Sequence, residues 1–294
     1  MPPSHFGLVL LICLAWGGNF LASAYALRHF PPFLFTALRL VVVLICLWPF
    51  LRPIPRAQRL RLVVVALCAG ALHFGLNFWA LQRAGTISSV AIALQSYIPM
   101  SALLAVVMLG ERIRWRAAAG IALAFGGVMV LGLDPTVLQA PGALGMTLVA
   151  AFMLAFSTTL MRGMVGIGTF ELQAWIAVIG IPVLAAISLA LEGNPVAAIR
   201  SAGWLDWAGV LYTGLIASLV GHGLLYWLVQ RHPVSQVTPY LLLTPVFAVA
   251  LGIFVWGDRP GPKLWLGGAM VLGGVLIVAL RAVATGRRVP EPVD

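Results

Sequence analysis

Long apolar runs dominate the sequence, and short polar, proline-rich or glycine-rich segments separate them. A helix needs about 20 mostly apolar residues to cross the hydrocarbon core of a bilayer, and each run is close to that length. Only 9% of the residues are charged, whereas a soluble domain carries about 25%. We therefore predict an all-α membrane protein with ten transmembrane helices, at 6–27, 33–51, 62–82, 87–109, 117–133, 143–161, 172–191, 207–230, 234–257 and 264–281.

The distribution of basic residues indicates how the chain is oriented. Twelve basic residues fall on the same side of the membrane as the N-terminus and five on the other side. Cytoplasmic loops carry the excess of Lys and Arg, so we expect both termini in the cytoplasm and a multi-pass protein of the cell inner membrane. We attribute the net charge of +10 to this orientation in the membrane, and we expect no binding of nucleic acid. The first run contains a site at Ala22–Ala24 that looks cleavable, but no Lys or Arg precedes it, so we expect a retained span.

The second half of the chain repeats motifs of the first half. The segment NFWALQR at 77–83 returns as LYWLVQR at 225–231. Similarly, GER at 110–112 returns as GDR at 257–259, which is 147 residues later, and several following glycines keep the same spacing. Three motifs at nearly constant spacing indicate an internal duplication.

Each repeat holds five predicted spans, and five is an odd number of crossings. The second repeat must therefore enter the membrane from the opposite side. We expect two inverted five-helix repeats, at 6–133 and 143–281, and a cytoplasmic tail at 282–294. Inverted repeats are typical of secondary transporters, whose substrate sites lie near the midplane between the repeats. A channel and a duplication retained for packing alone are alternatives, but the pattern favours a transporter that works by alternating access.

Four segments carry a resemblance to a known family. They are WGGNF at 16–20, PPFLFTALR at 31–39, GERIRWRAAAGIALAFGGVMVLG at 110–132 and GDRPGPKLWLGGAMVLGGVLIV at 257–278. Together they resemble the EamA branch of the drug/metabolite transporter superfamily, over essentially the whole chain. The resemblance implies ten helices in two inverted repeats. It also implies export of amino acids and related metabolites, as in the YddG-type aromatic amino acid exporters. Asp258 stands where the second Gly-Glu-Arg motif usually has Glu, which is a conservative change.

The titratable residues within the spans are histidines. All eight acidic residues lie in predicted loops, at helix ends or in the tail. Proton-coupled transporters commonly use a carboxylate buried in the membrane, so we expect facilitated diffusion, exchange or histidine-based coupling. His73 and His222 lie within spans and precede the repeated Trp79 and Trp227. A neutral imidazole donates and accepts a hydrogen bond and titrates near physiological pH. The two histidines either face a common cavity or bond to a neighbouring helix, and both interpretations stay open.

Further polar residues within the spans are candidates for binding a zwitterionic substrate. Amide and hydroxyl groups in lipid need partners, and aromatic rings pack well on apolar or aromatic side chains. The predicted substrate-binding residues are Asn19, His73, Asn77, Gln95, Tyr97, His222, Tyr226, Tyr240 and Thr244. The alternative for each is a hydrogen bond between helices or a place in the interfacial aromatic belt. Proline removes a backbone donor, so three prolines either gate the cavity or form fixed bends: Pro99, Pro239 and Pro245.

Three residues are assigned structural roles. Arg39 is the only basic residue within a span, where an arginine costs roughly 2.5–3.5 kcal/mol. We expect an anchor that reaches the interface or caps helix carbonyls, rather than a ligand for a substrate carboxylate. Gly126 and Gly273 lie in ladders of small residues that allow close helix packing. The three cysteines lie in apolar runs without metal-ligand spacing, so no disulfide framework, metal site or cofactor is expected.

The sequence also separates classes of function. It lacks the paired buried aspartates, the nucleophile elbow and the Walker motif of proteolytic, hydrolytic and ATP-driven membrane proteins, so we expect no enzyme. We predict an exporter of amino acids, including aromatic ones, and of related small metabolites, with organic cations as further candidate substrates. The alternatives are a membrane channel or a flippase for a lipid-linked metabolite of the same superfamily. A monomer and a homodimer both fit the sequence.

Overall fold

The computed structural model describes residues 3–229, 231–232 and 237–285. Every regular element within these residues is a helix, which confirms the predicted all-α class. In the same part of the chain, nine helices are long and apolar enough to span a membrane. The predicted span at 234–257 lies partly outside the described residues and otherwise forms the shorter apolar segment Tyr240–Trp256. The membrane architecture is therefore confirmed, and the count of ten spans stays a prediction.

Five of these candidate spans come from the first half of the chain. Its elements are α1 (Pro3–Ala26), α2 (Pro32–Leu47), η1 (Trp48–Phe50), η2 (Arg56–Gln58), α3 (Arg59–Val65), η3 (Ala66–His73), α4 (Phe74–Ala84), α5 (Ile87–Leu94), α6 (Tyr97–Leu109) and α7 (Trp115–Gly132). The elements from η2 to α4 follow one another without a break and make one long span. In contrast, α5 and α6 are separate helices that meet at Gln95 and Ser96.

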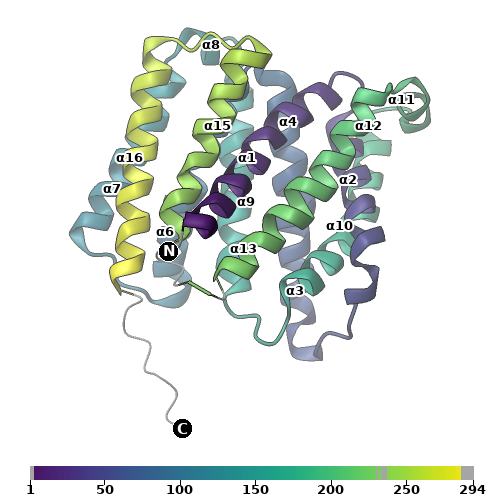
Figure 1. The fold of residues 1–294 in the computed structure, drawn as a ribbon, viewed down its shortest axis with the longest axis horizontal. Coiled ribbons are helices and arrows are strands. Elements are labelled where there is room, and N and C mark those ends of the chain that lie inside the picture. Colours follow the sequence, from purple (N-terminus) through teal and green to yellow (C-terminus); the bar gives the residue numbers. More distant parts are fainter. Residues whose placement is uncertain (1–2, 230, 233–236, 286–294) are drawn as a thin grey trace.

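The second half contributes the remaining candidate spans. Its elements are α8 (Pro135–Leu138), α9 (Pro141–Met161), α10 (Thr169–Leu191), α11 (Pro195–Ser201), α12 (Trp204–Leu211), η4 (Tyr212–Gly221), α13 (His222–Val229), η5 (Thr238–Leu242), α15 (Leu243–Leu251), η6 (Gly252–Trp256) and α16 (Pro262–Thr285). Figure 1 shows the long helices of both halves packed as one bundle, with α1 running between α15 and α12.

Large apolar side chains cover the sides of this bundle. Val107 is 83% exposed, Phe254 is 85% exposed and Met129 is 74% exposed. A water-soluble monomer rarely shows apolar patches of this extent. These surfaces suit contact with lipid tails, as the apolar composition predicts.

The Gly-acid-Arg motif of each repeat begins with a glycine at which a helix ends. Gly110 ends α6 with a φ of 68°, and Gly257 ends η6 with a φ of 87°. A residue with a Cβ is strained at such angles, whereas glycine is not. After the turn, the Asp258 carboxylate accepts hydrogen bonds from the backbone N–H of Ile87 at 3.3 Å and of Ser88 at 2.8 Å. Asp258 of the second repeat therefore caps the start of α5 in the first repeat.

The last helices of the two repeats, α7 and α16, lie side by side (Figure 1). A Cβ built on Gly120 would lie 2.9 Å from the carbonyl oxygen of Gly274, and one on Gly127 would lie 2.7 Å from that of Gly267. Residue numbers rise along α7 while they fall along α16, so the helices run antiparallel. Gly120 and Gly267 are equivalent positions of the repeat, as are Gly127 and Gly274. The contact therefore has two-fold symmetry about an axis perpendicular to the helices.

The two glycines singled out in the sequence, Gly126 and Gly273, lie next to this crossing. A Cβ on Gly126 would meet the methyl end of Met270 at 3.5 Å, and one on Gly273 would meet Leu123 at 3.9 Å. Both are ordinary van der Waals distances. A ladder of small residues identifies the packing face of a helix, but the rotation of the two helices decides which neighbouring glycine lies at the closest approach.

The second helices of the repeats, α2 and α10, also pack antiparallel. Glu192, just after α10, accepts hydrogen bonds from the backbone N–H groups of Phe33 and Leu34 at the start of α2, at 2.8 and 3.0 Å. Near the start of α10, Trp175 donates a hydrogen bond to the carbonyl of Arg52 beyond the end of α2, at 2.9 Å. Two pairs of equivalent helices thus run in opposite directions, as inverted repeats require.

The segments that carry the repeated motif, 77–83 and 225–231, end near opposite ends of α1. At one end, Gln82 donates a hydrogen bond to the carbonyl of Leu27 at 2.7 Å. At the other end, ring nitrogens of His5 and His232 lie 2.6 Å apart. Figure 1 shows α8 and α11 near the first of these ends. We refer to the two ends as the α8 end and the His5 end.

Candidate functional site

Two helices widen into π-helical turns at equivalent places in the two repeats. The π segment η3 ends at His73, and the π segment η4 ends directly before His222. A π turn is rare, releases backbone carbonyls from their usual partners and is frequent at functional sites. Both predicted histidines therefore stand where a helix changes from π to α geometry.

Side chains satisfy the carbonyl groups that η4 releases. Trp16 Nε1 donates a hydrogen bond to Ala217 O at 2.9 Å, and Ser218 Oγ donates one to Thr213 O at 2.7 Å. Trp16 also packs against the ring of His222, with 5.2 Å between the ring centroids. These contacts join α1 of the first repeat to η4 and α13 of the second.

The hydrogen bonds of the two histidines define which ring nitrogen carries hydrogen. Nδ1 of His73 lies 2.9 Å from Ala150 O on α9, and Nδ1 of His222 lies 2.9 Å from Ser218 O. A carbonyl oxygen only accepts, so Nδ1 donates in both rings. Nε2 of each neutral ring is then an acceptor. His73 thus makes the bond to a neighbouring helix that one interpretation of the sequence expects, and keeps Nε2 for a second role.

Arg39 lies between the repeats, close to both histidines. Its side chain is almost fully buried, with the residue 4% exposed. Nη2 donates a hydrogen bond to Ser218 Oγ at 3.0 Å, and the guanidinium carbon lies 3.5 Å from the centre of the Phe74 ring. The ring of His73 packs on Phe74, with 4.5 Å between ring centroids, and Nδ1 of His222 lies 2.9 Å from Ser218 O, so each histidine adjoins a residue that contacts Arg39. We call Arg39, His73, Ser218 and His222 the central cluster.

Several buried polar atoms within the spans have no hydrogen-bond partner among the described residues. They include Nε and Nη1 of Arg39, Oδ1 of Asn19, Oδ1 of Asn77 and Oγ1 of Thr244. Asn77 lies one helical turn after His73 and on the same face. An unsatisfied polar group in the membrane interior costs several kcal/mol. The set offers both donors and acceptors, as a zwitterionic ligand requires.

Other predicted site residues lie apart from the central cluster. Tyr240 is 43% exposed and packs on Phe6, with 5.2 Å between ring centroids. The backbone of Thr244 lies against Gly17 on α1. Gln95 and Tyr97 flank the break between α5 and α6. No hydrogen bond in the described part of the chain joins these residues to the central cluster, and the side chain of Tyr226 lies outside the described residues.

The prolines stand at breaks between helices. Pro99 lies in the first turn of α6, and Pro245 lies in the first turn of α15. Proline is tolerated there because the first N–H groups of a helix have no partner within it. The side chain of Pro239 lies outside the described residues. The fourth span is therefore divided into two helices just before Pro99 and is not one bent helix.

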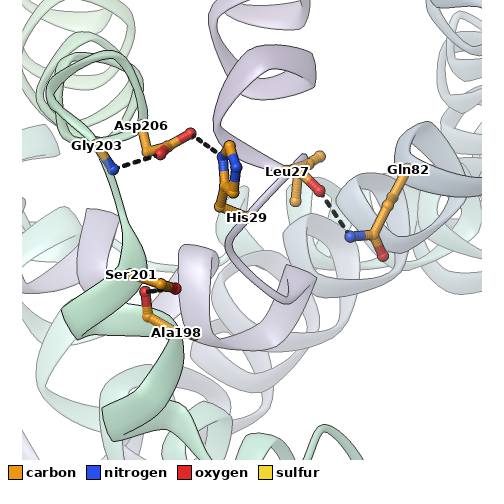
Figure 2. Close-up of polar contacts among 7 residues, drawn as sticks. All are labelled: Leu27, His29, Gln82, Ala198, Ser201, Gly203 and Asp206. Carbon is orange, nitrogen blue, oxygen red and sulfur yellow. Dashed lines mark hydrogen bonds and ion pairs between the residues drawn. The ribbon is translucent and has the colours of Figure 1, made fainter.

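Contacts between the repeats close the α8 end of the bundle. One oxygen of Asp206 lies 3.0 Å from Nδ1 of His29, and the other oxygen accepts a hydrogen bond from the backbone N–H of Gly203 at 2.7 Å. Figure 2 shows both contacts. In the same view, Gln82 of α4 donates a hydrogen bond to the carbonyl of Leu27. Three carboxylates of the second repeat thus hold segments of the first: Asp206, Glu192 and Asp258. We call these three carboxylates the α8-end clasp.

The corresponding contact at the His5 end is weaker. Glu111 is the repeat equivalent of Asp258, and it forms an ion pair with Arg162 at 2.8 Å. Both side chains are more than half exposed, at 54% and 56%. Exposed ion pairs contribute about 0–1 kcal/mol. The buried carboxylate of Asp258, with three hydrogen bonds from α5, holds its end more firmly.

A cavity of about 10 Å³ lies near the α8 end, between α5, α8 and α9. Its walls include Ala84, Ser89, Val137 and Thr147, and none of the predicted site residues. A space of this size holds about one water molecule. Among the described residues, no group of three or more His, Cys, Asp or Glu side chains forms a metal site. We place the candidate site at the central cluster, because buried polar groups of both repeats meet there.

The sequence analysis did not identify Phe74 and Ser218 as partners of Arg39. Each had a local signal, since Phe74 directly follows His73 and Ser218 lies one helical turn before His222. The missing information was the packing of α2 against η4, where a Cβ on Gly214 would lie 3.3 Å from the carbonyl oxygen of Arg39. That close approach brings Ser218 within reach of the guanidinium.

The apolar helical bundle and its polar interior define a multi-pass membrane protein of the transporter class. The chain belongs to the EamA-like transporter family, whose model matches residues 5–133 and 141–280, one copy in each half. The resemblance seen in the sequence motifs is thereby confirmed.

Comparison with individual proteins agrees with this family. The chain is 29% identical over 279 residues to a probable amino-acid metabolite efflux pump of Escherichia coli K12, covering 92% of this chain and 93% of that protein. It is 28% identical over 246 residues to a probable terminal-alkyne amino-acid exporter of Streptantibioticus cattleyicolor, covering 81% and 79%. It is 23% identical over 292 residues to the uncharacterized inner membrane transporter YedA of Escherichia coli K12, covering 94% and 90%. A crystal structure of a protein that is 17% identical to this chain superposes with a TM-score of 0.61, covering 98% of this chain and 99% of that one. This likeness shows that the two proteins share a fold, and nothing more.

Proposed function

We propose that this protein exports amino acids, including aromatic ones, and related small metabolites across the inner membrane by alternating access. The observation that carries the proposal is the central cluster, in which buried polar side chains of two antiparallel repeats meet. Unpartnered donors and acceptors around it suit a ligand with a carboxylate and an ammonium group. The relatives named as an amino-acid metabolite efflux pump and an amino-acid exporter support this substrate class. The relative named as an inner membrane transporter supports the location.

The proposed topology has ten spans in two inverted repeats, at 6–133 and 143–281. Antiparallel packing of α7 on α16 and of α2 on α10 supports the inversion. Both termini, including the tail at 282–294, then lie in the cytoplasm with the arginine-rich segment 52–61, as the positive-inside rule favours. In this orientation, the α8 end faces the outside.

Unequal closure of the two ends supports alternating access. In the α8-end clasp, Asp206 and Asp258 are buried and Glu192 is partly buried, whereas the ion pair of Glu111 with Arg162 at the His5 end is exposed. This asymmetry favours a state that is closed toward the outside. Equivalent inverted repeats can exchange their conformations, and this exchange would open the opposite end. The central cluster, with Asn77 one helical turn after His73, is then reached from each side in turn.

Counterflow in proteoliposomes tests the transport function. Vesicles that hold purified protein and unlabelled phenylalanine should accumulate labelled phenylalanine transiently above its equilibrium level, and uptake should saturate. A channel gives flux without counterflow. Leucine, threonine and an organic cation belong in the panel, each with and without a pH gradient. If every compound behaves as in protein-free vesicles, the proposed substrate class is wrong, and a lipid-linked substrate becomes the better candidate.

Site-specific labelling tests the topology. Arg83→Cys and Arg231→Cys, in a variant without the native cysteines, replace equivalent residues of the two repeats. An impermeant maleimide should label Arg83→Cys in whole spheroplasts and Arg231→Cys only after permeabilisation. Labelling of both positions from the same side would contradict the inverted arrangement.

A further inference from the structure

Arg39 is a buried cation, and no acidic side chain of the described residues pairs with it. Acidic residues in the described part of the chain lie at the ends of spans or in connections, and none lies beside Arg39. Charged residues within a membrane are costly and normally pair with an opposite charge. Here the face of the Phe74 ring takes that place, at 3.5 Å from the guanidinium carbon. An aromatic face attracts a cation but does not neutralise it.

The guanidinium uses little of its hydrogen-bonding capacity. An arginine has five N–H donors, and Nη2 donates to Ser218 Oγ at 3.0 Å. Nε and Nη1 are buried and have no partner among the described residues. Ser218 Oγ itself donates to Thr213 O at 2.7 Å, so it is held in place and fixes the position of the guanidinium. The two remaining nitrogens are therefore positioned for a ligand that only accepts.

The contacts of Arg39 differ from those that we described for a structural anchor. The residue is 4% exposed and lies midway along α2, enclosed by neighbouring helices. Its hydrogen bond goes to a hydroxyl group of the other repeat and not to a helix carbonyl. A role in holding two helices together would also leave no reason for two unsatisfied N–H groups in the interior.

We propose that Arg39 binds the carboxylate group of the cargo and thereby makes the transporter selective for carboxylates. Ser218 and Phe74 hold the guanidinium, and Nε and Nη1 supply charge-assisted hydrogen bonds. Asn77 lies one helical turn after Phe74 on α4, and its unpartnered Oδ1 accepts a hydrogen bond from the ammonium group of an amino acid. This inference rests on the proposed function and names the group of the substrate that the site selects.

An inorganic anion such as chloride offers the same negative charge. The neighbourhood of Arg39 favours the cargo carboxylate, because the unpartnered Oδ1 of Asn77 can accept a hydrogen bond from an ammonium group, which a lone anion does not have. A zwitterion satisfies the donors of Arg39 and the acceptor of Asn77 together. The experiment therefore includes chloride as a separate competitor.

The test compares three ligands that share one aromatic ring. L-phenylalanine, L-phenylalaninamide and 3-phenylpropionate compete with labelled phenylalanine in counterflow through wild-type protein. We expect phenylalanine to halve the labelled flux at a concentration at least about tenfold lower than its amide needs, as the loss of one charge-assisted hydrogen bond implies. Arg39→Gln should abolish this preference, and Arg39→Lys should keep part of it. Arg83→Gln is the matched control, because Arg83 also covers an aromatic ring, at 4.1 Å from Trp79, but at an exposed position. It should leave the preference unchanged.

The outcomes separate this inference from the proposed function. Equal competition by phenylalanine and its amide in wild-type protein overturns the inference, even if Arg39→Gln fails to fold. An unchanged preference in a folded Arg39→Gln variant also overturns it, as does saturable competition by chloride against a gluconate control. If no amino acid shows counterflow, the proposed function fails. In that case, thermal unfolding of the purified protein still tests carboxylate binding. Stabilisation by 3-phenylpropionate but not by 3-phenylpropionamide, lost in Arg39→Gln, supports it, and equal effects of the two compounds refute it.

Discussion

Replacing Gly127 with alanine should separate the two repeats where α7 crosses α16. The new Cβ would lie 2.6 Å from the backbone nitrogen of Val271 and 2.7 Å from the carbonyl oxygen of Gly267, whereas ordinary contact begins at 3.4 Å. Both neighbours are backbone atoms and cannot rotate away. The helices must therefore move apart by about 0.8 Å, the difference between 3.4 and 2.6 Å.

The cost of this separation follows from the way membrane helices associate. A gap of 0.5–1 Å forfeits roughly a quarter to a half of the van der Waals attraction across a contact. Between helices in lipid, this attraction is a main source of association. Overpacking in a tight interior typically costs about 1–3 kcal/mol. We therefore expect Gly127→Ala to destabilise the protein by about 2 kcal/mol and to lower its Tm in detergent by several degrees.

Gly126→Ala provides the matched control at the next residue of the same helix. Its Cβ would meet the end of the Met270 side chain at 3.5 Å, which is an ordinary contact. Alanine is also a better helix former than glycine by about 1 kcal/mol, so this variant should be as stable as wild type or more stable. Fluorescence-detected thermal unfolding of both purified variants makes the comparison. Equal Tm values for Gly126→Ala and Gly127→Ala would refute the antiparallel glycine contact.

Three further predictions concern the ends of the bundle. Asp258→Ala removes the cap of α5 and the bond to Ser88 Oγ at 2.6 Å, so it should cost about 1 kcal/mol or more, and an unchanged Tm would contradict the capping role. Burial and the nearby His5 lower the pKa of His232, so their contact is complete above about pH 6.5 and is lost as the pH falls. As the pH falls below about 6.5, the Tm of wild type should drop more steeply than that of His232→Ala, and parallel profiles would argue against the contact. Burial raises the pKa of Asp134, but hydrogen bonds from the starts of α8 and α16 and a nearby lysine outweigh it and hold the pKa below its ordinary value. The stabilisation by the ionised Asp134 is therefore complete above about pH 4 and is lost as the pH falls through the lowered pKa. Asp134→Asn should lower the Tm at neutral pH. If the variant has the same Tm as wild type, the carboxylate does not stabilise the fold.

Much of the site was visible in the sequence as a short set of candidates. His73 and His222 stood out because titratable groups are rare in apolar runs. The structure places each at a π-helical turn, next to a residue that contacts Arg39, namely Phe74 or Ser218. The same reasoning grouped Tyr240 with them, yet Tyr240 packs on Phe6 and is 43% exposed. A polar residue within a span has some partner, but its position along the chain does not tell which face of the helix it occupies.

The surroundings of Arg39 could not be predicted for a related reason. Its partner Ser218 lies 179 residues away in the sequence. The free energy of a buried arginine depends on what surrounds it, and those surroundings come from helices of both repeats. Depth along the helix suggested an anchor, whereas the contacts show two unsatisfied donors.

The amino-acid sequence by itself determined the helical class, the positions of most spans and the duplication. Lipid offers no hydrogen bonds to the backbone, so an apolar run of about 20 residues has essentially one solution, the helix. The glycines of the Gly-acid-Arg motifs were determined locally as well, by the positive φ at Gly110 and Gly257. Only the tertiary structure decided which glycines touch, which carboxylates close the α8 end and which polar groups surround Arg39. Those contacts depend on the rotation and crossing of helices, and small differences in packing set them.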